Sequence, residues 1–175
     1  MSRGVCLIAV ACVTLTSVGC APYRFGSAAL YPTEIRTVHI PIVQNTTYRH
    51  DLGVRLNEAL VREVEQRTPY KVVSSPNADS VLRCSITGTS KTVLSETEND
   101  DPRALDAAIS VAAAWTSRDG RRLMQNSRST MDADQLGFGQ SMRFVPEVGQ
   151  SIDTATQSAI DGLARRIVSQ MENRW

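Results

Sequence analysis

The chain has 175 residues, of which 42% are hydrophobic and 21% are charged. A chain of this length and composition is predicted to fold as one domain, because it can bury most of its apolar surface. Nineteen Lys and Arg residues nearly balance eighteen Asp and Glu residues, so the formal net charge is +1. This near-neutral charge gives no support for nucleic acid as a partner.

The N-terminus has the pattern of an export signal. Met1–Gly4 carries one charged side chain, and Val5–Val18 follows without charge or proline. A helix of that length rises about 21 Å, less than the roughly 30 Å of a bilayer core. Gly19-Cys20 resembles the end of a bacterial lipobox, although Ser17 stands where that motif usually has Leu. We predict a removed lipoprotein signal peptide over residues 1–19, the alternative being a plain secretory signal that ends near a cysteine.

In the lipobox the cysteine thiol is diacylated and becomes the new N-terminus, so we predict lipidation of Cys20 and a lipidated tether over residues 20–34. Cys6 and Cys12 lie in the signal, which leaves Cys84 as the remaining free thiol. A lone cysteine cannot form an intramolecular disulfide. Because Cys84 alternates with apolar neighbours, we predict a small core residue rather than a reactive thiol.

The first predicted strand is Ile35–Val43, in which alternate apolar residues share one face. Pro41 indicates an edge position or a bulge near the end of this strand. His39 lies on the other face and has no second ligand within reach in the sequence, so we predict no metal site there. Asn45-Thr46-Thr47 is predicted to form a turn.

Asp51–Arg67 is predicted as a helix packed on a sheet, because its apolar residues recur at helical spacing. Thr68-Pro69 ends this helix, since the residue before proline avoids the helical region. Tyr70–Ser74 and the longer Asp79–Leu94 follow as predicted strands. Gly88 indicates a bulge or bend within the longer strand.

Ser95–Pro102 is acidic, yet it lacks the glycine and terminal glutamate of a calcium loop, so we predict a solvated turn. Leu105–Thr116 has alternating apolar residues, and its alanines would also suit a helix. Arg118-Asp119-Gly120-Arg121 is a tight-turn signal, which favours a strand over Leu105–Thr116. Leu123–Thr130 is then predicted to pair back across that turn.

Met131–Gly149 is rich in Gly, Asp and Gln and is predicted as a loop. Ser151–Glu172 is predicted as a long helix with one continuous apolar stripe, and Leu163 and Ile167 of that stripe are predicted core residues. The order of elements predicts an α+β fold in residues 35–175. We expect a two-layer sandwich with two helices packed on one face of a four- to five-stranded mixed sheet.

The sequence contains no nucleophile elbow, phosphate-binding glycine loop, metal-ligand cluster or paired carboxylates that spacing would single out as catalytic. We therefore predict that the protein is not an enzyme and that it holds no metal. No cofactor is expected other than the covalent diacylglycerol and N-acyl chain on Cys20. Two or more such chains give stable anchoring, whereas one gives only reversible binding.

Several segments resemble the LptE family, the lipopolysaccharide-assembly lipoproteins of the outer membrane. The resemblance covers most of the chain after the signal, in the expected order. It is carried by Gly19-Cys20 with Tyr23–Gly26, Ile35–Pro41, Asn45–Thr47, Ala78–Leu82 and Gly162–Val168. These are fold motifs rather than chemical motifs.

The resemblance implies a role without covalent chemistry. LptE lies as a plug inside the lumen of the LptD β-barrel and assists delivery of lipopolysaccharide to the outer leaflet. By this resemblance the chain is a lipid-anchored protein at the periplasmic face of the outer membrane, with a β-barrel and lipopolysaccharide as partners. Ala21, rather than Asp, follows the lipidated position, and in enteric lipoproteins that pattern accompanies outer-membrane sorting.

Lipopolysaccharide carries anionic phosphates, which arginine binds bidentately. Arg118, Arg121 and Arg122 cluster at the predicted tight turn, and we name these three residues the arginine turn. Our hypothesis is that the arginine turn contacts lipopolysaccharide, with help from Arg103 or Lys91. The alternative is that these charges keep the end of a hairpin solvated.

A second resemblance, to the periplasmic domain of CsgG-like proteins and to TolB amino-terminal domains, leaves another function open. By that reading the chain is an envelope scaffold or a secretion-associated lipoprotein. A CsgG-type pore needs a pair of amphipathic membrane hairpins, and this chain has none of suitable length to spare. The sequence therefore favours the LptE family.

Overall fold

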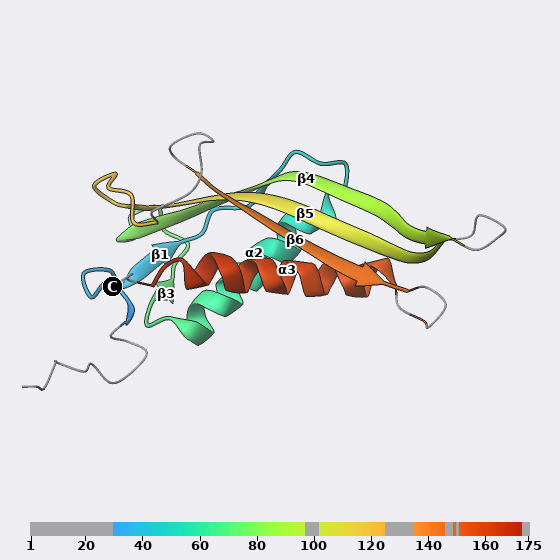
Figure 1. Cartoon of the computed structure of the whole chain (residues 1–175). Coiled ribbons are helices and arrows are strands. Elements are labelled where there is room, and N and C mark those ends of the chain that lie inside the picture. The colour runs from blue at the N-terminus through green and yellow to red at the C-terminus, as the bar shows by residue number, and fades with distance from the viewer. Residues whose placement is uncertain (1–29, 97–101, 125–134, 146–148, 150, 173–175) are drawn as a thin grey trace, which may run out of the picture.

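The computed structural model describes residues 30–96, 102–124, 135–145, 149 and 151–172. The predicted signal peptide, Cys20 and all but the last residues of the predicted tether lie outside this part of the chain. A mixed sheet is covered by two helices that lie on one of its faces (Figure 1). The predicted α+β sandwich is therefore confirmed.

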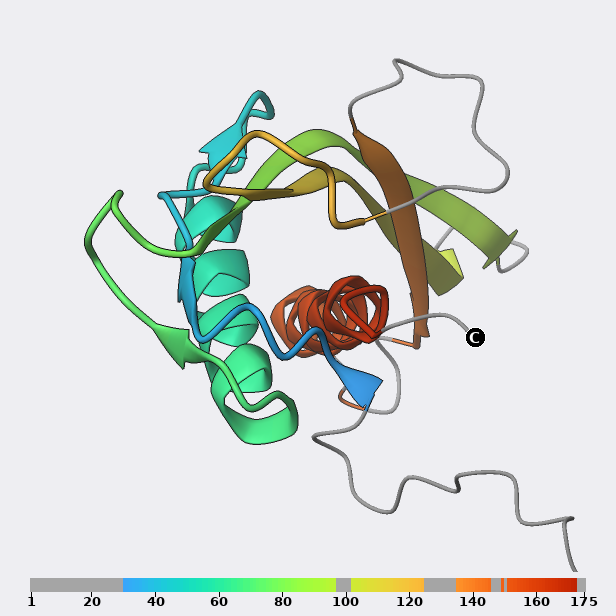
Figure 2. The ribbon, with the colours of Figure 1, turned by 90° about the vertical axis from the view of Figure 1, so that its left-hand side faces the viewer.

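The sheet has the strand order β3-β1-β4-β5-β6, with β2 also paired to β4. Its parallel part joins β1 to β3 and β4, and β2 to β4, whereas β4, β5 and β6 pair antiparallel. The strands are β1 (Thr37–His39), β2 (Gln44–Asn45), β3 (Lys71–Val72), β4 (Ser80–Glu96), β5 (Pro102–Ser117) and β6 (Leu136–Phe144). Viewed toward one end of the molecule, the sheet curves over α3 while α2 lies beside it (Figure 2).

Helix α2 spans Asp51–Arg67, the same bounds that the sequence predicts. It ends at Thr68, whose backbone is extended because Pro69 follows. The Thr68 hydroxyl donates a hydrogen bond to the Val64 carbonyl at 2.6 Å. Helix α3 spans Ile152–Ser169. Ser151 is its N-cap, and the Ser151 hydroxyl accepts a hydrogen bond from the Thr154 N–H.

One predicted loop and one predicted strand differ from the structure. The predicted loop Met131–Gly149 contains β6, because Leu136, Phe138 and Phe144 alternate inward between glycines and polar residues that suggested a loop. The predicted strand Ile35–Val43 is broken into β1 and β2, and Pro41 lies in the break rather than at a sheet edge.

The tight turn is present at the predicted place, but its continuation differs from the prediction. Gly120 adopts a φ of 81°, and Arg122 returns to form a single bridge with Thr116. The long antiparallel neighbours of β5 are β4 and β6 rather than Leu123–Thr130. Residues 125–130 of that predicted strand lie outside the described residues. The predicted bulge at Gly88 is confirmed by a register shift between Ile86 and Gly88.

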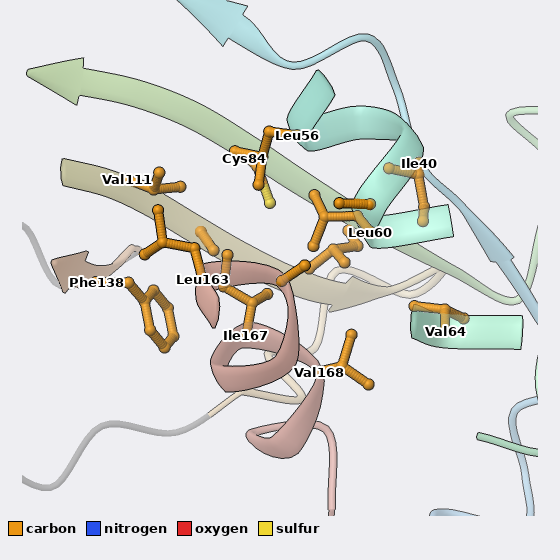
Figure 3. Close-up of a cluster of buried hydrophobic side chains, with 14 of the residues drawn as sticks. Ile40, Leu56, Leu60, Val64, Cys84, Val111, Phe138, Leu163, Ile167 and Val168 are labelled. Carbon is orange, nitrogen blue, oxygen red and sulfur yellow. The ribbon is translucent and has the colours of Figure 1, made fainter. Parts of the chain in front are cut away.

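The main core lies between the helices and the inner face of the sheet (Figure 3). Leu163 and Ile167 of α3 are fully buried in it, as predicted, and they face residues of α2 and β4 such as Leu60 and Cys84. At one end of this core the ring of Tyr70 packs between those of Tyr31 and Trp115, with ring centroids 5.7 and 5.8 Å away.

Candidate functional site

The arginine turn lies at the end of the molecule where the described chain begins. Asp79 is the residue around which this end is built. Its carboxylate accepts hydrogen bonds from the Arg36 and Thr37 N–H groups and from the Thr37 hydroxyl, at 2.9–3.1 Å. The Thr37 hydroxyl in turn accepts a bond from the Asp79 N–H at 2.9 Å. This reciprocal pair ties β1 to the start of β4.

The hydrogen bond from Thr37 is the largest cause that lowers the pKa of the Asp79 carboxyl, followed by the Arg36 N–H, while the positive charge of Arg118 adds to them. The carboxylate is thus held ionised beside the turn. Arg118 donates its backbone N–H to the Asp79 carbonyl at 2.8 Å, and its Nε donates to the Ala78 carbonyl at 3.2 Å. One Nη of Arg118 also donates to the Asn77 carbonyl.

Arg121 pairs with Glu34 at 2.9 Å, across the gap between the turn and the segment before β1. Both side chains are largely open to solvent, at 59% and 68% exposure. An exposed ion pair contributes only about 0–1 kcal/mol, so a more highly charged anion could displace Glu34. Arg118 and Arg121 line a polar cavity of about 210 Å³, and Asp119 also lines it, whereas Arg122 does not.

The sequence does not predict which carboxylates lie beside the arginine turn. The turn signal places the three arginines together, but their carboxylate partners Glu34 and Asp79 come from segments far away along the chain. Three carboxylates, those of Glu34, Asp79 and Asp119, line this cavity together with Arg118 and Arg121, so it carries no excess of positive charge. Both readings of the arginine turn, as an anion contact and as a solvated hairpin end, remain compatible with this geometry.

The two further cations considered from sequence do not join the arginine turn. Lys91 is paired with Ala107, whereas the turn follows the pairing of Ser80 with Ser117. The separation along β4 is roughly 35 Å at about 3.3 Å per residue. Arg103 follows the first residue of β5, at the same distant end of the sheet. Lys91 borders a different cavity, of about 240 Å³, whose wall is largely apolar.

Tyr31 belongs to the part of the predicted tether that the structure describes. Its ring is buried at 4% exposure against Tyr70, and its hydroxyl donates to Glu172 at 3.4 Å. Burial is the first cause that raises the pKa of Tyr31, with the negative charge of Glu172 adding to it. Cys20 lies outside the described residues, and the extended chain between it and Tyr31 spans at most roughly 40 Å.

Cys84 and His39, the thiol and imidazole considered from the sequence, have structural roles. Cys84 is buried in the main core, and burial raises the pKa of its thiol to about 12, so it is no nucleophile near neutral pH. The Nδ1 atom of His39 lies 3.0 Å from the Val73 carbonyl oxygen. Within the described ranges no group of three or more His, Cys, Asp or Glu residues is arranged to hold a metal ion.

Neither of the two described helices is both long and apolar enough to cross a membrane.

Comparison with known proteins supplies a family. A family model described as "LptE: Lipopolysaccharide-assembly" matches residues 35–175. No curated protein matches the sequence. Among solved structures, the hypothetical protein CT253 from Chlamydia trachomatis is similar at a TM-score of 0.53 and 13% identity, covering 78% of this chain and 95% of that one. At this identity the similarity shows the fold alone.

Two similar lipoproteins have lower scores. A minor lipoprotein from Acinetobacter baumannii has a TM-score of 0.47 and 12% identity, covering 82% of this chain and all of that one. The rare lipoprotein B from Shewanella oneidensis has a TM-score of 0.46 and 13% identity, covering 78% of this chain and 93% of that one.

Proposed function

This chain belongs to the LptE family of lipopolysaccharide-assembly proteins, and we propose that it is an outer-membrane lipoprotein that acts as plug and partner of an LptD-type β-barrel. In this role it assists transfer of lipopolysaccharide to the outer leaflet, from the periplasmic face of the membrane. It binds and positions, and carries out no covalent chemistry. The observation that carries the proposal is the family match over residues 35–175.

The proposed plug role is supported by the way the domain is held together. Two helices pack over the main core on one face of the sheet, and the Asp79 and Thr37 hydrogen bonds join the start of β4 to β1. A rigid wedge of this kind can occupy a lumen without losing its own packing. The partnership is tested by affinity capture of the lipidated protein from detergent-solubilised outer membrane. An outer-membrane β-barrel is the expected largest partner, and its absence would refute the partnership.

We also propose that Cys20 carries the lipid anchor. The support is the sequence pattern that ends in Gly19-Cys20. Labelled palmitate should enter the wild-type protein and should not enter the Cys20→Ser variant. Labelling of both proteins would place the lipid at another residue. Labelling of neither would refute the lipid anchor.

The arginine turn is the proposed contact for the phosphates of lipopolysaccharide. A phosphate offers up to two negative charges and several acceptor oxygens, so it can compete with the single exposed carboxylate of Glu34. Arg121→Glu with Arg122→Glu should weaken binding of lipopolysaccharide. The matched control reverses two exposed arginines on the uncovered face of the sheet, Arg83 and Arg143. Equal binding by the two double variants would favour the solvated hairpin end.

A further inference from the structure

The large apolar side chains that this domain exposes are concentrated at one corner. In the part of the chain that the structure describes, five large hydrophobic residues are exposed. Tyr48 at 100%, Ile42 at 83% and Val54 at 59% all lie between the break after β1 and the first turn of α2. The other two, Val93 and Leu94, lie near the end of β4. Figure 2 shows the loop between β2 and α2 projecting from the top of the molecule.

The loop that carries Tyr48 is fixed by its own polar side chains. The Asn45 amide donates to the Arg49 carbonyl at 2.6 Å, and its carbonyl oxygen accepts from the Thr47 N–H and hydroxyl at 2.9 and 2.7 Å. Thr46 donates both its N–H and its hydroxyl to the Ile86 carbonyl of β4. Tyr48 therefore projects from a rigid frame and not from a loose loop.

The underside of the same corner is packed tightly. A Cβ atom added at Gly53 in the first turn of α2 would lie 3.1 Å from the Val43 carbonyl oxygen and 3.6 Å from Cβ of Asn45. Gly53 thus allows the first turn of α2 to lie close against Val43 and Asn45. The fully exposed ring of Tyr48 contributes little to the packing of its own chain and is free to enter a pocket of a partner.

The charges around Tyr48 are already paired within the chain. Arg49 lies 3.5 Å from Asp153 and 3.9 Å from Asp51, and Arg55 lies 3.3 Å from Asp51. Two cations and two carboxylates leave this corner without net charge. An anionic membrane surface or a nucleic acid would find little to bind, whereas an apolar pocket of a protein fits an aromatic side chain on a neutral surface.

We propose that Tyr48, with the exposed Val54 in the first turn of α2, is an anchor by which this domain docks on a protein partner that receives the phenol ring in an apolar pocket. Binding at a preorganised anchor loses little conformational entropy, and tyrosine is enriched among the residues that dominate interfaces. The identification of that partner as the β-barrel rests on the proposed function. The anchor itself follows from the exposed ring, the rigid loop and the paired charges.

The first test places the photo-crosslinking residue p-benzoylphenylalanine at position 48 of the full, lipidated chain in intact cells. The matched control places it at Glu65, an exposed position in the last turns of α2. A protein adduct at 48 and none at 65 is expected. No protein adduct at 48, or an adduct to lipid only, would overturn the proposal.

The second test measures capture of the β-barrel by tagged variants. Tyr48→Ala should reduce capture by roughly tenfold or more, as expected for an anchor residue, while Tyr48→Phe should retain most of it. Glu65→Ala should have no effect, and because Tyr48 is fully exposed, Tyr48→Ala should keep the wild-type melting temperature. Unchanged capture by Tyr48→Ala would refute the anchor.

The two tests separate this inference from the proposed function. If the wild-type protein captures no β-barrel, the proposed partnership fails, and the adduct at position 48 alone decides whether the anchor exists. If the wild-type protein captures the β-barrel and Tyr48→Ala captures it equally well, the partnership stands and the anchor is refuted.

Discussion

The two halves of the β4–β5 ribbon differ sharply, although one continuous pair of strands forms both. Before the bulge at Gly88, the inward row of β4 is buried, with Leu82, Cys84 and Ile86 at 0–6% exposure. After the bulge, every described residue of β4 from Thr89 onward is exposed. Figure 1 shows the ribbon continuing past the N-terminal end of α3.

The difference indicates that burial against the helices, and not strand pairing, decides which side chains of β4 join the core. The first half faces the main core between α2 and α3. In the second half only β5 has buried side chains: Ile109, opposite Thr89, joins the main core, and Leu105 and Ala107 form a small second cluster with Phe144 and with Ala155 of α3. Pairing between β4 and β5 is continuous across both halves apart from the register shifts. The predictions below test this contrast.

The largest effect is expected in the main core. Ile167→Ala removes a fully buried side chain from α3 and should lower the free energy of unfolding by about 2–5 kcal/mol. Denaturant unfolding followed by circular dichroism measures this change. The conservative Ile167→Val variant should lose about 0.5–1.5 kcal/mol. Wild-type stability in Ile167→Ala would show that α3 is not part of the core.

Leu105→Ala probes the second cluster with a comparable loss of volume. Leu105 is 4% exposed, but few buried side chains surround it. We expect a loss of about 2 kcal/mol, at the lower end of the range for Leu→Ala, because a small cluster near the surface can collapse or admit water. Equilibrium unfolding of both alanine variants gives the comparison directly. A loss equal to that of Ile167→Ala would mean that the ribbon is equally well packed along its length.

The contrast was only partly predictable from the sequence. The helical period and Thr68-Pro69 define α2 to the residue, and the alternation in β4 predicts the strand and its bulge. The sequence cannot show where coverage by α3 ends, because Val93 and Leu94 look as apolar as the buried residues before them. β6 was missed because Gly137 and Gly139 occupy its uncovered face, where no large side chain is needed.

The candidate sites show the same limit. The turn signal brings together Arg118, Arg121 and Arg122 without long-range information. Their partners Glu34 and Asp79 could not be assigned, since the distance along the chain says nothing about pairing in space. The exposure of Tyr48 could not be predicted either, because it depends on hydrogen bonds from the neighbouring loop to β4.

Asp79→Asn tests the hydrogen bonds that join the start of β4 to β1. The wild-type carboxylate accepts three hydrogen bonds, and the first of them, from Thr37, is the main cause of its lowered pKa. We expect a loss of about 1 kcal/mol near neutral pH, less than for a buried bond to a charge, because the side chain is 38% exposed.

The pH dependence of that loss has a defined sign. A lowered folded pKa stabilises the protein above the unfolded value of about 3.9, and this contribution disappears as the pH falls through the folded pKa. The difference between the wild type and Asp79→Asn should therefore be greatest near pH 7 and shrink below about pH 4. A difference that does not vary with pH would assign the effect to packing and not to charge.

The smallest effect is expected in the uncovered half of the ribbon. Val93→Thr exchanges a methyl group for a hydroxyl at a strand position that is 42% exposed, so both residues suit the strand and neither is forced to bury a polar group. The free energy of unfolding should change by less than about 0.5 kcal/mol, measured by the same denaturant titration. The same exchange at Val111, directly across from Ile86 in the main core, should be clearly destabilising, because it buries a hydroxyl at 1% exposure. If both variants lost the same stability, coverage by the helices would not be what separates the two halves, and the exposed half would have to be held by contacts to other described elements.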